Sequence, residues 1–313
     1  MGGNLRRKKR VRERMRMSNH ERKKITVGGT EVVVVPESQC PADKTMLPYQ
    51  IDLEQFRRGW NKHEVYTANQ PLCMGGQLYM FNRYQACGSI VHMPDAQFSK
   101  GGHQSRIEVV DRAGKKQWVI FPLKDRYQKS IEQCLLHEPE KNIRKVMATL
   151  RQLYGGYENY RSREESLSWA MLSLIQGPGG RTWNEAGPYE LTLAQLNCSM
   201  FEWVRKQLGL AIHQHWTTVL FPHGRLEHPS EWVAEMGRKI GALVYLGGGS
   251  AQAAYIRRED FDARRMTFVA QNWRVPTLAR PYGTGFDPTA SVLDPLFIGG
   301  PGLVRDLIEG PAW

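Results

Sequence analysis

Apolar residues from about residue 61 onward recur in two patterns, short continuous runs and longer repeats spaced at three or four residues. Short runs bounded by polar residues or glycine are typical of strands, and the longer repeats are typical of helices. The runs predict strands within 64–71, 89–93, 105–111, 116–123, 211–220, 242–246 and 266–271. The repeats predict helices within 77–87, 139–153, 162–176, 190–208, 230–240 and 301–309.

The order of these elements indicates the fold class. Strands and helices alternate in the second half of the chain, which is typical of an α/β fold with parallel strands. The runs at 105–111 and 116–123 are joined by "RAGK" and predict an antiparallel hairpin. Helix 162–176 is predicted to begin with a Ser162–Glu165 capping box, and helix 190–208 to end at Gly209. We therefore expect an α/β fold with a mixed, partly parallel sheet flanked by helices.

The first 60 residues differ in composition from the rest. Residues 1–24 contain eleven Lys or Arg against two Glu, a net charge of +9 in a chain that carries +12. Repulsion between like charges predicts an arm that is disordered or a transient helix when free, or that a partner orders. The segment "ITVGGTEVVVVP" predicts a hairpin that turns at Gly28–Gly29. We divide the chain into a basic arm (1–24), a hairpin and connector (25–60) and an α/β body (61–313).

Composition limits the classes of function. Hydrophobic residues make up 41% of the chain, which is enough for a sizeable core. No apolar run reaches the roughly 18 residues of a membrane span, and no apolar segment follows the basic start as in a secretory signal. Five scattered Cys without a C-x-x-C pair argue against a disulfide framework or a thiolate zinc site. We expect a cytoplasmic protein and assign no metal and no cofactor.

The stretch "MPDAQFSKGGHQSR", residues 93–106, follows a predicted strand and is rich in polar side chains. Binding loops gather at strand ends in α/β proteins. Lys100 and Arg106 can neutralise a phosphate or carboxylate. Asp95 can act as a base, and His103 can transfer protons near neutral pH. The alternative is a hairpin loop with surface ion pairs. The amides Gln97 and Gln104 lie in the same stretch.

Further polar groups stand at the ends of other predicted strands or at the starts of predicted helices. They are Asn69 with Gln70, Lys124, the glycine turn with Gly247, Gly248 and Ser250, and Ser291 with Asp294. Amide groups and glycine-rich turns can hold an anion. Helix caps, a tight turn and a solvated edge lysine are the structural alternatives. The histidines His213, His215 and His223 complete no familiar metal-ligand spacing, so exposed histidines are favoured over a metal site.

In this order and spacing, the motifs resemble those of the WbqC-like family. The matching motifs are Gln70-Pro71, the D-x-Q-[FY]-x-K segment at 95–100, "FPLK" at 121–124, the glycines at 247–249 and the P-x-x-S-[IV]-[IL]-D motif at 288–294. The resemblance covers roughly residues 64–309. The chain departs from the family pattern by "LCMGG" after Gln70-Pro71, by Ser105 before Arg106, and by its basic arm.

The resemblance implies acyl or aminoacyl transfer to a nucleotide-activated amino sugar in surface-polysaccharide synthesis. The candidate catalytic residues are Asp95, His103 and Asp294. The candidate substrate-binding residues are Asn69, Gln70, Gln97, Lys100, Gln104, Arg106, Lys124, Gly247, Gly248, Ser250 and Ser291. The expected substrate is nucleotide-like and bears phosphate.

The basic arm supports two alternatives. Arginine-rich segments bind phosphate backbones, so the protein would modify nucleic-acid bases, as in phage-type DNA hypermodification. Otherwise it would be a non-enzymatic protein associated with nucleic acid or a virion. DNA or RNA is the partner under either alternative. The candidate contacts are Arg6, Arg7, Lys8, Lys9, Arg10, Arg12, Arg14 and Arg16.

Overall fold

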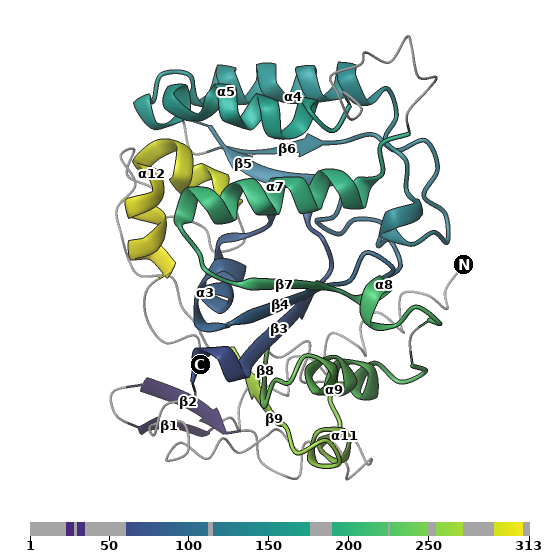
Figure 1. Ribbon diagram of the computed structural model, residues 1–313. Helices are drawn as coiled ribbons and strands as arrows, with labels where there is room; N and C mark the ends of the chain where they lie inside the picture. Colours follow the sequence, from purple (N-terminus) through teal and green to yellow (C-terminus); the bar gives the residue numbers. More distant parts are fainter. Residues whose placement is uncertain are drawn as a thin grey trace, which may run out of the picture.

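The computed structural model of the chain describes residues 23–27, 30–34, 61–111, 115–175, 190–224, 226–248, 255–271 and 291–308 (Figure 1). The strands are β1 (Lys23–Val27), β2 (Thr30–Val34), β3 (Val65–Asn69), β4 (Ser89–His92), β5 (Arg106–Val110), β6 (Lys116–Ile120), β7 (His213–Trp216), β8 (Val244–Gly247) and β9 (Thr267–Ala270). The α-helices are α3 (Leu78–Ala86), α4 (Pro139–Tyr154), α5 (Glu158–Leu172), α7 (Leu193–Leu208), α8 (Thr217–Leu220), α9 (Pro229–Lys239), α11 (Arg258–Asp262) and α12 (Leu293–Ile308). Short 3-10 turns are η2 (Lys62–Glu64), η3 (Cys73–Gly75) and η4 (Ile131–Gln133).

Five strands form one sheet in the order β7-β4-β3-β8-β9, and each of these pairings is parallel. Counted along the chain, this is the order 3-2-1-4-5 of a doubly wound α/β fold. The order reverses between β3 and β8, which are neighbours in the sheet but far apart in sequence. The α/β class is therefore confirmed. The antiparallel pair β5–β6 forms a separate sheet rather than a part of the parallel one.

The parallel sheet is buried on both faces, as parallel sheets require. Alternate side chains point to opposite faces, so Ile90 and Leu246 join the core with α3 and α7. Tyr66 and Tyr245 join a second core with α9 and α11. Figure 1 shows α3 and α7 on one side of the sheet and α9 and α11 on the other.

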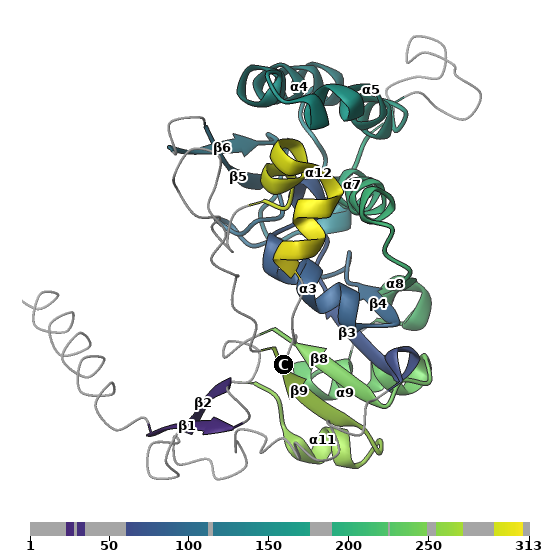
Figure 2. The ribbon, with the colours of Figure 1, turned by 90° about the vertical axis from the view of Figure 1, so that its left-hand side faces the viewer.

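A long insertion separates β4 from β7 and carries β5, β6, η4, α4, α5 and α7. Figures 1 and 2 show α4 and α5 as an outer layer beyond the β5–β6 sheet. Helix α12 joins this insertion to the rest. The fully buried ring of Phe297 packs against Tyr154, Tyr160 and Trp203 of the insertion, and the Ile308 carbonyl accepts from the Asn82 amide of α3 at 2.8 Å. The insertion and the parallel sheet therefore share one core.

Most predicted elements are present, and the boundaries differ in three places. Helix α5 begins at Glu158, so the predicted capping box at Ser162 is wrong, and the Ser162 hydroxyl instead donates to the carbonyl of Asn159. The predicted strand 211–220 divides into β7 and α8. Helix α12 begins well before residue 301, with left-handed backbone at Gly300 before Pro301. Glycine and proline in this helix obscured its first half in the sequence pattern.

The predicted N-terminal hairpin is present. Strands β1 and β2 pair antiparallel, with Val27 opposite Thr30 and Gly28–Gly29 between them. The rest of the basic arm, residues 1–22, lies outside the described residues. No helix in the part of the chain that the structure describes is long and apolar enough to span a membrane.

Candidate functional site

A cavity of about 510 Å3 lies at the carboxyl ends of β3 and β8, where the strand order reverses. Ligands in doubly wound α/β proteins bind at this switch point. The larger apolar side chains of the lining are Met93, Leu226, Trp232, Tyr245 and Tyr255, with Val233, Pro229 and two alanines between them. The polar groups in it are Gln70, Gln97 and Glu227. The position and size of the cavity suit a small organic ligand.

An acidic hollow of about 520 Å3 adjoins this cavity, because Gln97 lines both. Asp95, Glu132 and the amides Gln128 and Gln133 line the hollow. Backbone hydrogen bonds hold its two walls together: the Glu132 N–H donates to the Pro94 carbonyl at 2.9 Å, and the Phe98 N–H donates to the Lys129 carbonyl at 2.9 Å. We call the cavity and the acidic hollow together the switch-point site.

The two carboxylates of the acidic hollow, Asp95 and Glu132, are in different environments. Asp95 accepts a hydrogen bond from the hydroxyl of Thr217, a fully buried residue at the start of α8, which fixes its orientation. Burial and the nearby charge of Asp95 raise the pKa of Glu132 above its usual value. A carboxylate with a raised pKa is a better proton acceptor near neutral pH.

The predicted cations do not line either hollow. Lys100 is exposed. The guanidinium of Arg106 stacks on the Trp118 ring at 4.3 Å, and the exposed Lys124 pairs with Glu190 at 3.3 Å. The lining that the structure describes for the switch-point site is therefore amide, carboxylate and aromatic in character.

His103 and Gln104, adjacent in sequence, point to different surroundings. The His103 ring lies 5.6 Å from that of Trp118, and burial together with the positive charge of Arg106 lowers the His103 pKa. Both causes favour the neutral form of the ring. Gln104 is buried behind Gln70 and donates to its side-chain oxygen at 2.6 Å. Gln104 thus supports a residue of the site from behind.

The remaining predicted residues that the structure describes lie outside the lining of the switch-point site. Asn69 ends β3 and contacts α3 rather than the cavity. The Ser291 hydroxyl accepts from the Leu293 N–H at 3.1 Å, and buried Asp294 accepts from the Tyr154 hydroxyl at 3.1 Å. Gly247 ends β8 and Gly248 follows it, whereas Ser250 lies outside the described residues.

Several residues of the site carried no recognisable signal in the sequence. Glu132 and Thr217 join Asp95 from distant segments of the chain, and neither belongs to a motif. Trp232 and Tyr245 have the pattern of ordinary core residues of a helix and a strand. Only the packing of α9 against the end of the sheet brings these rings to the cavity.

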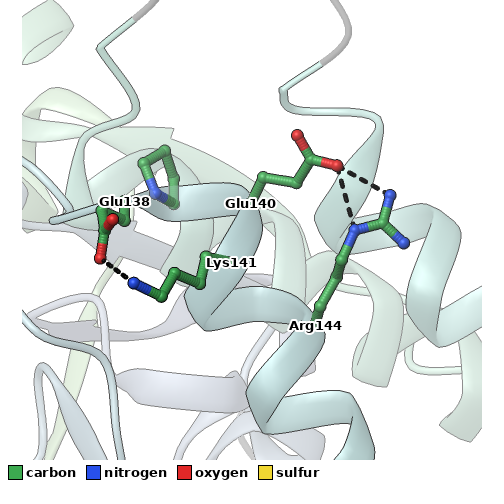
Figure 3. A pocket seen from close by; sticks show the side chains of 5 residues that line it. Glu138, Glu140, Lys141 and Arg144 are labelled. Carbon is green, nitrogen blue, oxygen red and sulfur yellow. Dashed lines mark hydrogen bonds and ion pairs between the residues drawn. The ribbon is translucent and has the colours of Figure 1, made fainter.

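A further hollow at the start of α4 is a weak candidate for a ligand site (Figure 3). Glu138 pairs with Lys141 at 2.8 Å, and Glu140 pairs with Arg144 at 2.8 Å. These side chains are exposed, and each charge already has a partner on the same short segment. Within the described ranges, no group of three or more His, Cys, Asp or Glu side chains is placed to hold a metal ion.

The fold and the cavity define an α/β protein with a doubly wound parallel sheet and a cavity at its switch point, the place where proteins of this fold class generally bind ligands. The chain belongs to the WbqC-like protein family, whose family model matches residues 78–306. The match runs from α3 into α12 and begins after Gln70-Pro71, so it is narrower than the expected 64–309. No curated protein and no solved structure matches the chain.

Proposed function

We propose that this protein is a transferase that attaches an acyl or aminoacyl group to the amine of a nucleotide-activated amino sugar. The observation that carries the proposal is the switch-point site, in which an aromatic cavity adjoins an acidic hollow. Aromatic rings such as those of Trp232 and Tyr255 provide flat apolar surface for a nucleobase. Carboxylates and amides suit the hydroxyl and amine groups of a sugar.

The two carboxylates of the acidic hollow, Asp95 and Glu132, have complementary roles in this proposal. Asp95, fixed by Thr217, holds the protonated amine and orients it. Glu132 accepts a proton from the amine, for which its raised pKa suits it. The neutral nitrogen then forms a bond to the acyl carbonyl carbon, and the bond from that carbon to the donor's leaving group breaks. Glu132 releases this first proton to solvent, takes the second proton from the nitrogen, which is positively charged once the new bond has formed, and passes it to the leaving group.

The test is an assay of the full-length protein with UDP- and dTDP-linked amino sugars and a set of acyl-CoA and aminoacyl donors. We expect the mass of a free-amine sugar nucleotide to increase by one acyl group, measured by mass spectrometry. The matched N-acetylated sugar nucleotide should not react, because its nitrogen is not nucleophilic. Equal modification of the free-amine and N-acetylated sugar nucleotides would contradict the proposal. So would the absence of modification with every donor.

The charge of the basic arm favours a second candidate, action on nucleic acid. Residues 1–24 carry +9 and the other 289 residues only +3, so the arm provides the main electrostatic attraction for a phosphate backbone. Under this candidate, the switch-point site would receive a base or nucleotide of the bound strand.

Deleting residues 1–22, which leaves β1 intact, should flatten the salt dependence of oligonucleotide binding. The slope of log K against log salt concentration should fall by about 0.9 for each phosphate of duplex DNA that the arm no longer neutralises. Fluorescence anisotropy with one labelled oligonucleotide at several salt concentrations measures the binding constants that give this slope. A full-length variant with Gln at the eight basic positions of residues 6–16 is the length-matched control and should behave like the deletion. Equal slopes for all three proteins would exclude the arm as the nucleic-acid contact.

A further inference from the structure

A buried arginine, for which the described residues provide no anionic partner, lies at the switch point, on the opposite face of the sheet from the cavity. Arg83, in α3, is 2% exposed and is among the largest fully buried side chains described. Its Nη2 donates to the Asn69 side-chain oxygen at 2.9 Å. Its Nε is buried and has no hydrogen-bond partner. Among the described side chains, no carboxylate forms an ion pair with it.

The position of the guanidinium follows from the direction of helical side chains. Side chains of an α-helix tilt toward its N-terminus, so Arg83 extends toward the carboxyl end of β3, where Asn69 is the last residue. Asn69 is itself held by its amide N–H donating to the Tyr84 hydroxyl at 3.1 Å. The guanidinium is therefore fixed at the edge of the sheet where ligands of doubly wound folds bind.

Gln271, the residue directly after β9, also contacts α3 at this edge of the sheet. Gln271 donates to the Tyr79 carbonyl at 2.8 Å and to the Asn82 side-chain oxygen at 3.0 Å. Asn69 at the end of β3 and Gln271 after β9, the two strands that flank β8, thus both contact α3. The neighbours named here are amides, phenols and backbone carbonyls, and none of them neutralises Arg83.

We propose that Arg83 binds an oxyanion, a phosphate or carboxylate group of the ligand, at the carboxyl end of β3. A buried charge without a counter-ion destabilises the folded state, and a bound oxyanion would supply the missing charge. The planar guanidinium matches the two oxygens of such a group. A ligand that straddles the edge would place its anion beside Arg83 and its remainder in the switch-point site. The anion site does not depend on the transfer chemistry, so failure of the acyl-transfer assay would leave it unaffected.

The main test is Asn69→Asp, which places a carboxylate within hydrogen-bonding distance of Arg83 without changing side-chain size. Binding of pyrophosphate and of malonate to the full-length protein is measured by calorimetry at constant ionic strength. We expect the tighter-binding anion to lose affinity about 10- to 150-fold, the range for a hydrogen bond to a charged group. We also expect the variant to melt at a higher temperature without anion, because Arg83 then has a permanent partner. The preference between the two anions identifies the group as phosphate or carboxylate.

Two further variants keep the test decisive. Arg83→Met removes the charge at similar length and should show the same loss of affinity. Arg161→Met removes an exposed arginine of α5 and should bind as the unmodified protein does. The basic arm is the same in all these proteins, so differences between them report on the site. Unchanged affinity in Asn69→Asp, or no binding of either anion by the unmodified protein, would overturn the proposal.

Discussion

Replacing Glu132 with Gln should lower the rate of the proposed amine transfer by about 10²- to 10⁴-fold, the usual contribution of a positioned general base. The amide keeps the size and hydrogen-bonding groups of the side chain but cannot accept the proton of the amine. The turnover of the sugar nucleotide, followed by mass spectrometry, measures the decrease. Glu140→Gln is the matched control, because Glu140 is an exposed glutamate on α4 that pairs with Arg144. It should leave the rate unchanged.

The pH profile provides an independent readout of the same residue. The rate should fall when Glu132 becomes protonated, and the fall should begin at a higher pH than for an ordinary glutamate because the pKa of Glu132 is raised. Asp95→Asn removes one cause of that rise, so the acid limb of the remaining activity should shift to lower pH. Full activity in Glu132→Gln, or an acid limb that does not move in Asp95→Asn, would contradict the assigned roles.

His92 should make the fold sensitive to acid. It ends β4, is 3% exposed, and lies between the rings of Phe201 and Trp216. Burial is the main cause that lowers its pKa from 6.5 to about 4. As the pH falls below 6.5, His92 therefore binds a proton in the unfolded chain but remains neutral in the folded chain. The contribution of His92 to the free energy of unfolding is fully present above pH 6.5. The free energy of unfolding should decrease by up to about 3 kcal/mol as the pH falls to about 4.

Urea unfolding at several pH values between 4 and 7.5 measures this effect. In His92→Gln the side chain does not titrate and can still donate to Gln214, the partner that His92 contacts at 3.0 Å. Its free energy of unfolding should therefore depend less steeply on pH. His213→Gln, which replaces an exposed histidine on the neighbouring strand, is the control and should keep the original dependence. Parallel curves for the native protein and His92→Gln would show that His92 does not govern acid unfolding.

The sequence by itself determined the local elements and hence the α/β class. Apolar spacing located the strands and most helices, because the periods of 2 and 3.6 residues reflect backbone geometry within one segment. Thr192 and Gln195 begin α7 and Gly209 ends it for equally local reasons. Gln70, Asp95 and Gln97 were found in the same way, since strand-end loops can be recognised from their neighbours along the chain.

Only the tertiary structure decided the order of the strands and the direction of the polar side chains. Parallel strands pair through backbone groups that all residues share, so the sequence does not state that β8 lies beside β3. The 93–106 loop divides between two surroundings: Asp95 meets Thr217, while Arg106 stacks on Trp118. Glu132 and Arg83 became candidates through contacts with Asp95 and Asn69 that join separate elements. Such contacts depend on how whole layers pack, and no local pattern encodes them.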